Sequence, residues 1–332
     1  MHRFLAVVGV CGVVSAIGLG TQAPASPAWA YGLPPADPAA PPRAPRTAPP
    51  PAPPPVDPTP HQIPGTTKTL TMAQIRDYWN VGDWFPDEHP PMPNVVVHGR
   101  QPHVRGCAMC HMPNGKGRPE NAPLTALPAG YFVQQLLDFK HGLRTSADTR
   151  KANTALMIEA ATEMTDEEMR ESAAYFASMK WTPWITVREA ATVPKTRLSG
   201  NVFFRLPGNV TEPIGNRIIE TPEDADRFEL RDPHSGFIAY VPSGSVRKGG
   251  EFVRGGGGKT LPCTICHGQD LEGLGPVPGI AGRSPSYIMR QLWDLQQGAR
   301  KGEWSPLMKP VVEKLTQDDM LTIAAYLAAQ GR

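Results

Sequence analysis

The sequence predicts a mainly α-helical protein in which one unit occurs twice, and three observations support this. The stretch Cys107-Ala108-Met109-Cys110-His111 returns 156 residues later as Cys263-Thr264-Ile265-Cys266-His267. A helix-start signal follows late in each copy, Thr-x-x-Glu at Thr165 and the weaker Thr-x-x-Asp at Thr316. Six residues between these points keep the first offset: Tyr131, Gln135, Leu136, Asp138, Gly142 and Arg144 match Tyr287, Gln291, Leu292, Asp294, Gly298 and Arg300. An internal repeat of this kind indicates two copies of one unit.

Each copy begins with two cysteines three residues apart and a histidine directly after the second. On a helical turn, positions i, i+3 and i+4 share one face, so two thiols can bond one porphyrin while the imidazole points at its iron. The pattern C-x-x-C-H is typical of covalent attachment of a c-type haem. Zinc sites, thiol redox centres and disulfides also use cysteine pairs, but none requires the histidine. The sequence predicts two haem c groups, held by Cys107, Cys110 and His111 and by Cys263, Cys266 and His267.

The repeat also indicates the second axial ligand of each iron. Beyond Arg144 the distance between matching residues falls from 156 to 151, and Leu156-Met157 matches Leu307-Met308. We expect both methionines in a loop ahead of the last helix, where a soft thioether suits haem iron. Many methionines only fill cores, and Met164 matches Leu315, which cannot be a ligand.

Histidines before the first motif offer an alternative at that iron. His89, His98 and His103 lie in this segment, and any of them in place of Met157 would give a bis-histidine haem. The second copy has no comparable histidines near its motif, which favours methionine at both sites.

The motifs together resemble class I c-type cytochromes. The resemblance rests on C-x-x-C-H, the Tyr-x-x-x-Gln-Leu helix ending in glycine, the late Leu-Met and the Ala-Ala-Tyr of the terminal helix, and it covers roughly residues 95–180 and 244–330. It implies two fused cytochrome c domains with histidine and methionine at each iron. It also implies a backbone carbonyl that accepts the second imidazole N–H, with Pro123 and Pro278 as candidates.

Five segments are expected along the chain. They are a signal peptide (1–30), a disordered proline-rich linker (31–67), a first cytochrome c domain (68–181), a connector (182–243) and a second cytochrome c domain (244–332). The signal has an apolar run and ends in Ala28-Trp29-Ala30, an A-x-A cleavage site. Its removal takes away Cys11, the one cysteine outside the two motifs. Runs such as Pro49-Pro50-Pro51 favour an extended, solvated chain.

Within the first domain, a short helix is expected over residues 71–84 and longer helices over 131–141 and 165–179. Phe132, Leu136 and Phe139 of the middle helix are expected to face the haem. The family has a helix just before its haem motif, and the second copy offers one around residues 245–254. The first copy instead has Val95-Val96-Val97, short and β-branched.

The connector matches nothing in the repeat. Strand-like composition over residues 216–219 and 236–241 indicates local β-structure. A connector of this length is expected to pack between the haem domains and fix their separation.

Charge and coordination point to electron transfer. The formal net charge is only +2, which gives no reason to expect a nucleic-acid partner. Histidine and methionine at each iron leave no open position, so we expect a periplasmic electron carrier, not an enzyme, that relays single electrons from a donor such as a dehydrogenase to an acceptor such as a terminal oxidase.

The alternatives are a diheme peroxidase or other haem oxidoreductase, or a haem subunit of a larger respiratory complex. Membrane association is expected only through a retained signal anchor.

Overall fold

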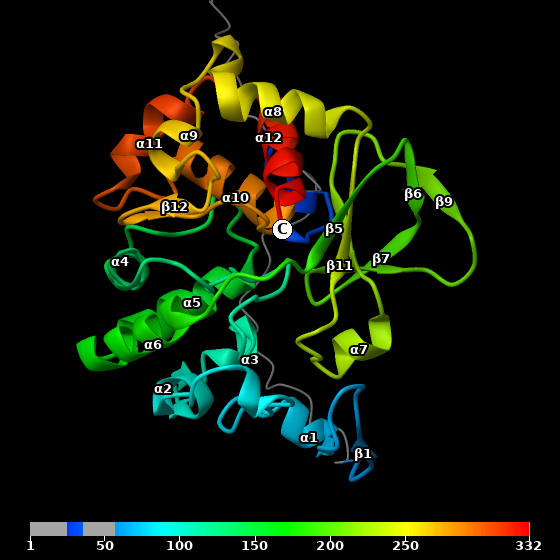
Figure 1. Ribbon diagram of the computed structural model, residues 1–332, viewed down its shortest axis with the longest axis vertical. Helices are drawn as coiled ribbons and strands as arrows, with labels where there is room; N and C mark the ends of the chain where they lie inside the picture. Colours follow the sequence, from blue (N-terminus) through cyan, green and yellow to red (C-terminus); the bar gives the residue numbers. More distant parts are fainter. Residues whose placement is uncertain (1–24, 36–56, 332) are drawn as a thin grey trace, which may run out of the picture.

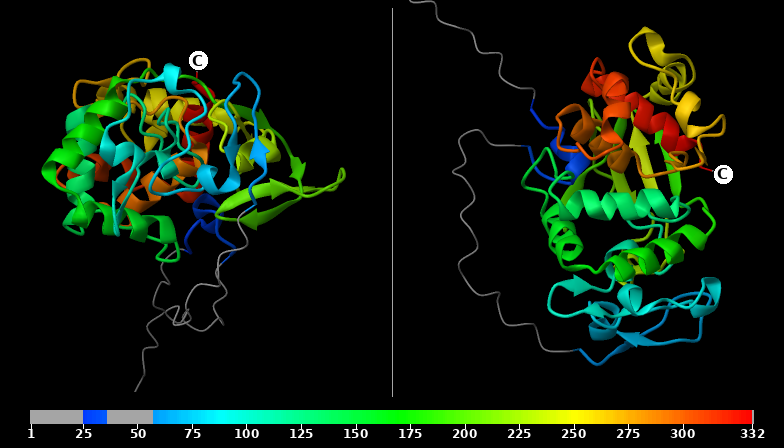
Figure 2. Two further views of the ribbon diagram at one scale, coloured as in Figure 1. Left: turned by 90° about the horizontal axis from the view of Figure 1, so that it is seen from below. Right: turned by 90° about the vertical axis from the view of Figure 1, so that its left-hand side faces the viewer.

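The computed structural model describes residues 25–35 and 57–331, which form two helical units stacked on each other with a β-rich connector along one side of both (Figure 1). The orthogonal views show the same stacking (Figure 2). This is the mainly α-helical, two-domain architecture that the sequence predicts. Of the expected signal peptide and linker, residues 1–24 and 36–56 lie outside the described residues. Within the described ranges, none of the helices has the length and apolarity needed to span a bilayer.

The first unit contains three helices of 12 or 13 residues after a lead-in of short elements. In chain order the elements are β1 (Pro60–His61), β2 (Leu70–Thr71), α1 (Met72–Ile75), η2 (Pro86–Glu88), α2 (Asn94–Val97), β3 (Gly99–Arg100), β4 (Val104–Arg105), α3 (Ala108–His111), α4 (Ala129–Lys140), α5 (Ala152–Glu163) and α6 (Asp166–Ser178). The predicted cap of α6 is present, because Glu168 N–H donates to the Thr165 hydroxyl at 3.2 Å and the Glu168 carboxylate accepts from Thr165 N–H at 2.8 Å. Phe132 of α4 stacks on Phe176 of α6 in the core.

The lead-in differs from a simple reading of its sequence in two places. The helix expected over residues 71–84 is only one turn long, because the Asp77 carboxylate accepts the Trp79 N–H at 2.7 Å and so forms a turn where the helix would continue. The β-branched stretch is a helical turn, α2. Val95 and Val96 are almost fully buried there, and this packing outweighs their low helix propensity.

The second unit repeats this plan. Its elements are α8 (Ser245–Gly255), η3 (Gly256–Gly258), α9 (Thr264–His267), β12 (Gly273–Leu274), β13 (Val277–Pro278), α10 (Pro285–Gln296), α11 (Ser305–Val312) and α12 (Gln317–Ala329). The predicted helix before the motif is α8, which crosses α12 closely. A Cβ atom on Gly249 would lie 2.0 Å from the carbonyl oxygen of Thr322, so only glycine permits this approach.

The connector is a small β-structure. It comprises β5 (Ile185–Glu189), β6 (Thr192–Pro194), β7 (Thr196–Ser199), β8 (Val202–Arg205), β9 (Thr211–Pro213), β10 (Ile219–Pro222), α7 (Ala225–Glu229) and β11 (Phe237–Val241). In its three-stranded sheet, β11 is central, antiparallel to β10 and parallel to β5. The strand expected over residues 236–241 is β11, whereas the one expected over 216–219 begins only at Ile219.

The connector contacts both helical units. Arg118 of the first unit lies over the Phe228 ring of α7, with the guanidinium carbon 3.8 Å from the ring centroid. On the other side, the buried carboxylate of Glu220 accepts hydrogen bonds from Ser284 and Ser286 at the start of α10. The connector therefore joins the two units along their flank and does not lie between them (Figure 1).

The two units meet directly at a seam formed by matching parts of the repeat. Thr145 N–H donates to the carbonyl of Ala299 at 2.7 Å, and Lys301 N–H donates to the carbonyl of Leu143 at 2.8 Å. A short described segment, residues 25–35, also lies at this seam and includes η1 (Ala28–Tyr31), which packs against α10.

Candidate haem sites

Both C-x-x-C-H motifs form a single helical turn, as their spacing predicts. In α3, the backbone N–H of His111 donates to the carbonyl of Cys107 at 3.0 Å. In α9, His267 makes the same bond to Cys263 at 2.9 Å. The two cysteines and the histidine of each motif therefore share one face of their turn.

Each motif histidine is oriented through its Nδ1 atom. His111 Nδ1 is 2.8 Å from the carbonyl oxygen of Ala122, and His267 Nδ1 is 2.7 Å from that of Pro278. The prediction of Pro278 is confirmed and that of Pro123 is wrong. In both copies the acceptor lies 11 residues after the histidine, and because a backbone carbonyl does this work, alanine serves as well as proline.

These contacts leave the other ring nitrogen free to bind a metal. A carbonyl can only accept, so Nδ1 carries the proton and Nε2 keeps its lone pair. Burial lowers the pKa of His111 to about 4 and also lowers the pKa of His267. Both imidazoles are therefore neutral at pH 7, the form in which histidine is a metal ligand.

The first motif opens onto a cavity of about 350 Å³. The three side chains predicted to face the haem, Phe132, Leu136 and Phe139, line this cavity. Cys107, Cys110 and His111 also line it. A flat aromatic ring with two thioether bonds fits a cavity with these walls.

Basic side chains also line this cavity. Lys151 and Arg290 are buried, and their hydrogen bonds go to neutral carbonyls, including those of Tyr31 and Pro119. Burial, together with the nearby positive charge of Arg290, lowers the pKa of Lys151 to about 7. Buried cations without a directly bonded carboxylate favour an anion, which suits the propionates of a haem.

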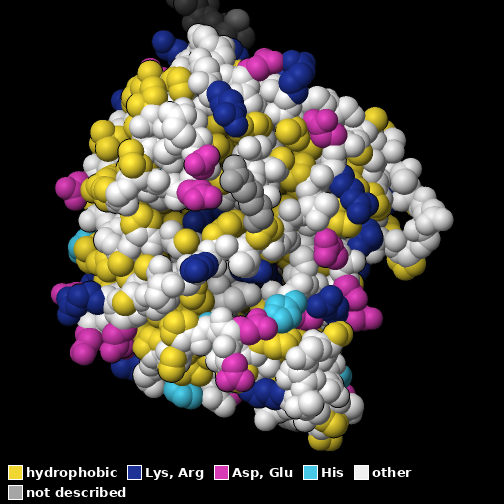
Figure 3. Space-filling view, viewed as in Figure 1, with side chains coloured by type: hydrophobic (Ala, Val, Ile, Leu, Met, Phe, Trp, Pro, Cys, Tyr) yellow, Lys and Arg dark blue, Asp and Glu magenta, His cyan; other side chains and the backbone are white. Residues whose placement is uncertain are grey.

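The second motif lies at a more open surface. Cys266 is exposed, as are Ile265 beside it in the motif and Leu307 in α11, which are 62% and 70% exposed. Hydrophobic side chains are visible over α9 and α11 in Figure 3. A surface of this kind fits a flat apolar group that is held by thioethers along one edge and lies against it.

The two candidate methionines lie in helices, and the expectation of a loop is wrong. Met157 is in α5 and lines the cavity with His111, whereas Met308 is in α11 and packs partly buried against the second core. The α5 segment is rich in alanine, which favours helix, whereas α11 has one proline in its first turn and a second, Pro310, inside the helix, so its helical form does not follow from local propensity. Their role as iron ligands stays a prediction.

The three alternative histidines point elsewhere. His89 lies between Asp83 and the Tyr175 hydroxyl, at 3.2 and 3.0 Å. His98 is exposed and bonds to a backbone carbonyl, and His103 pairs with Glu159 at the surface. These three histidines do not line the cavity, whereas Met157 does.

The motif cysteines do not have the properties of a redox or nucleophilic pair. None of the four cysteines in the described part of the chain forms a disulfide with another. Burial raises the pKa of Cys107 to about 12 and that of Cys263 to about 11, so these thiols are protonated at pH 7 and poor nucleophiles. Among the residues that the structure places, no group of three or more histidine, cysteine or acidic side chains converges as it would in a four-ligand zinc site.

Sequence reasoning missed Arg231, which comes from the connector. Its guanidinium donates to the carbonyls of Ala108 and Met109 in α3 and contacts the sulfur of Met112 at 3.5 Å. Burial lowers its pKa to about 10, which still leaves it charged at pH 7. The connector has no counterpart in the repeat, so the offset that revealed the other site residues could not reveal this one.

Comparisons with known proteins agree with this geometry. The sequence model of the family described as cytochrome c matches residues 96–180. Cytochrome c-554(548) from Halomonas halodenitrificans is 38% identical over 69 residues, which cover 20% of this chain and 83% of that protein. Cytochrome c4 from Azotobacter vinelandii is 24% identical over 227 residues, 67% of this chain and 82% of that protein. The thiosulfate dehydrogenase electron acceptor from Stutzerimonas stutzeri is 25% identical over 238 residues, 70% and 83% of the two chains.

The geometry and the comparisons lead to one assignment. Each unit presents two thiols and an imidazole on one helical turn, and the imidazole has a free, unprotonated Nε2 atom. The match to cytochrome c-554(548), at 38% identity, extends over 83% of that protein. The chain belongs to the class I c-type cytochromes, as a diheme member with two covalently bound haem c groups.

Proposed function

We propose that the protein relays single electrons in the periplasm, with His111 and Met157 as axial ligands in the first unit and His267 and Met308 in the second. The bound haems supply the reversible change in iron valence. The protein's own residues hold each group by two thioethers and one oriented imidazole. The observation that carries the proposal is that Met157, matched by the repeat to Met308, lines the same cavity as His111.

Filled axial positions favour relay over catalysis at the iron. A peroxidase or other haem oxidoreductase needs a position where substrate can bind, and a methionine at each distal side would occupy it.

The donor in this proposal is a dehydrogenase. One relative is named a thiosulfate dehydrogenase electron acceptor, which supports this class of donor, and an oxidase is the proposed acceptor. The predicted signal peptide supports export to the periplasm, where such partners would be met.

The test is ligand binding by the reduced wild-type holoprotein. We expect low-spin ferric signals from both irons in electron paramagnetic and magnetic circular dichroism spectra of the oxidised protein, and little carbon monoxide binding to the reduced protein at equilibrium. Rapid, stoichiometric carbon monoxide binding at either iron would instead favour an enzyme. Turnover of peroxide by the reduced protein would overturn the relay proposal directly.

A further inference from the structure

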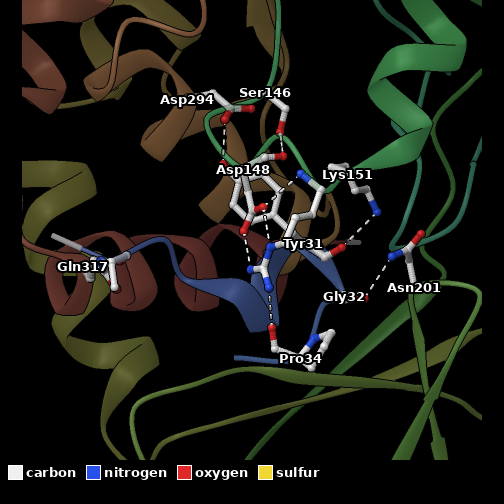
Figure 4. Close-up of polar contacts among 11 residues, drawn as sticks. Tyr31, Gly32, Pro34, Ser146, Asp148, Lys151, Asn201, Asp294 and Gln317 are labelled. Carbon is white, nitrogen blue, oxygen red and sulfur yellow. Dashed lines mark hydrogen bonds and ion pairs between the residues drawn. The ribbon is translucent and has the colours of Figure 1, made fainter. Parts of the chain in front are cut away.

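The predicted cleavage motif Ala28-Trp29-Ala30 is not at an accessible end of the molecule. It forms η1, in which Ala28, Ala30 and Tyr31 are buried, and Ala30 and Tyr31 belong to the core of the second unit. Figure 4 shows this segment crossing between elements of both units and the connector. If residues 1–30 were removed during export, the core of the second unit would lose side chains that fill it in the structure.

Tyr31 ties the segment to both helical units through one carboxylate. Its hydroxyl donates to Asp294 Oδ1 of α10 at 2.6 Å, and the same oxygen accepts the backbone N–H of Ala147 from the first unit at 2.8 Å. The carbonyl of Tyr31 accepts from Lys151 of the first unit at 3.1 Å. Two units and the segment therefore meet at one buried point (Figure 4).

Gly32 ties the segment to the connector. The Asn201 side chain donates to the carbonyl of Gly32 at 3.0 Å. Gly32 has a φ of +63°, and a Cβ atom there would lie 2.0 Å from the Asn201 carbonyl oxygen. Only glycine combines this backbone conformation with so close a contact.

Cleavage after Ala30 would damage this junction. Arg290, a buried cation, donates to the carbonyl of Ala30 and would lose that partner. The amides of Gly32 and Leu33 would lose their acceptors, the carbonyls of Trp29 and Ala28. The new α-ammonium of Tyr31 would also be buried close to Arg290 and Lys151, where another positive charge is strongly unfavourable.

A second A-x-A motif lies five residues upstream, at Ala23-Pro24-Ala25. Ala25 is exposed in the structure, and its carbonyl accepts a hydrogen bond from the partly exposed Gln317 side chain. Cleavage after Ala25 therefore keeps every buried interaction described above, and the hydrogen bond that it removes between described residues lies at the surface.

We propose that the leader is cleaved between Ala25 and Ser26, and that residues 26–33, termed the strap, stay in the mature protein and hold the two cytochrome units and the connector together. The mature chain then begins with Ser-Pro-Ala-Trp-Ala-Tyr. This inference does not depend on the redox partners or on the axial ligands.

The cleavage site is tested on holoprotein produced from the full chain in a bacterium that matures c-type cytochromes. We expect the intact mass and the N-terminal sequence to start at Ser26. An Ala25→Leu variant should accumulate as precursor, because signal peptidase needs a small residue there, whereas Pro35→Leu, at another exposed position, should be processed normally. Tyr31, Met1 or any other first residue in the wild type would overturn the proposal.

The strap's role is tested by a matched pair of glycine variants. Gly32 and Gly215 have φ values of +63° and +58°, but a Cβ atom on Gly215 meets nothing within 4 Å. We expect Gly215→Ala to lower the thermal midpoint of the holoprotein by about 2 °C and Gly32→Ala by at least about twice that. Equal shifts would show that the strap is not docked.

Hydrogen exchange on the wild type keeps this test decisive if Gly32→Ala does not fold. The amides of Gly32 and Leu33, which donate within the strap, should exchange far more slowly than an unstructured peptide. Exchange at the unstructured rate would mean a free N-terminal tail and would contradict the proposal.

Discussion

Arg144 and Arg300, which occupy the same place in the two copies of the repeat, face each other across the seam, and each donates to a glutamine of the opposite unit. Arg144 donates to Gln291 at 2.9 Å, and Arg300 donates to Gln135 at 2.7 Å. Each arginine also donates to the glutamine of its own unit. The duplication has therefore produced a symmetric polar contact that neither copy could form alone.

This arrangement predicts that the two arginines are coupled energetically. Each glutamine oxygen accepts from both guanidinium groups, so after loss of one arginine the other still satisfies it. We expect Arg144→Ala and Arg300→Ala each to lower the free energy of unfolding by about 2 kcal/mol, and the double variant to lose more than the sum. Denaturant unfolding of the four proteins measures this.

Electrostatic repulsion between the two arginines would also make the double variant lose more stability than the sum of the single variants. Removal of either arginine alone already relieves this repulsion, so the second removal brings no further relief. Arg247→Ala is the control, since Arg247 forms an exposed pair with Glu251 one helical turn away, and we expect a loss below about 0.5 kcal/mol. Additivity of the two seam variants within about 0.5 kcal/mol would contradict the coupling.

The axial methionines give a second prediction. Met157→Ala should abolish one low-spin signal and open the first iron to carbon monoxide, and Met308→Ala should do the same at the second. Difference spectra of the reduced variants with carbon monoxide measure this, and we expect about one equivalent bound in each case, because one position opens.

The control for this experiment is Met164→Leu. Met164 also lines the first cavity, but its counterpart in the repeat is Leu315, so leucine should preserve the packing and both signals. Loss of the first signal in Met164→Leu, together with an unchanged Met157→Ala spectrum, would reverse the assignment.

The repeat explains how much of the site could be predicted. The motif turns, the helix that lines the cavity with Phe132 and the cap at Thr165 follow from local spacing, which the two copies confirm independently. Features set by one residue's surroundings could not be predicted in this way. The carbonyl of Ala122 replaces that of Pro123 because the backbone register, not the side chain, selects the acceptor.

Packing between distant segments limited the fold prediction. Val95 and Val96 form a helical turn because both are buried, which their β-branched sequence does not reveal. Arg231 and Tyr31 reach the haem-bearing units from segments without a copy in the repeat, so only the folded chain brings them there.

A third prediction concerns acid stability. In both units the carboxylate that caps the last helix also pairs with a cation from the segment before the haem motif: Glu168 with Arg100 at 2.9 Å, and Asp319 with Lys259 at 2.6 Å. The hydrogen bond from Arg100 lowers the pKa of Glu168 below its ordinary value of 4.5. The stabilisation is therefore fully present above pH 4.5 and is lost as the pH falls through the lower, folded-state pKa.

We expect Arg100→Met to raise the pKa of Glu168 toward its ordinary value. The free energy of unfolding of this variant should then fall less steeply with decreasing pH below pH 4.5 than that of the wild type. Urea titrations at several pH values below 5 measure this slope. Arg76→Met is the control, because Arg76 and Glu229 form a pair in which both side chains are mostly exposed, and it should leave the acid slope unchanged. An unaltered slope in Arg100→Met would contradict the linkage.

The last prediction concerns the charge that the connector places against the first haem motif. Arg231 is positively charged at pH 7 and donates to the carbonyls of Ala108 and Met109. A fixed positive charge beside α3 disfavours the more positive, oxidised state of the first centre. Arg231→Met should therefore lower the reduction potential of the first haem and leave that of the second unchanged.

Arg231→Lys separates charge from hydrogen bonding in this experiment. Lysine keeps the charge but lacks the planar group that reaches both carbonyls, so we expect it to retain most of the potential while losing about 1 to 3 kcal/mol of stability. Arg188→Met in β5, a change at an exposed connector position, should alter neither. Potentiometric titrations that resolve the two haems decide the matter: equal shifts at both haems, or a shift in Arg231→Lys as large as in Arg231→Met, would show that the connector acts through structure and not through its charge.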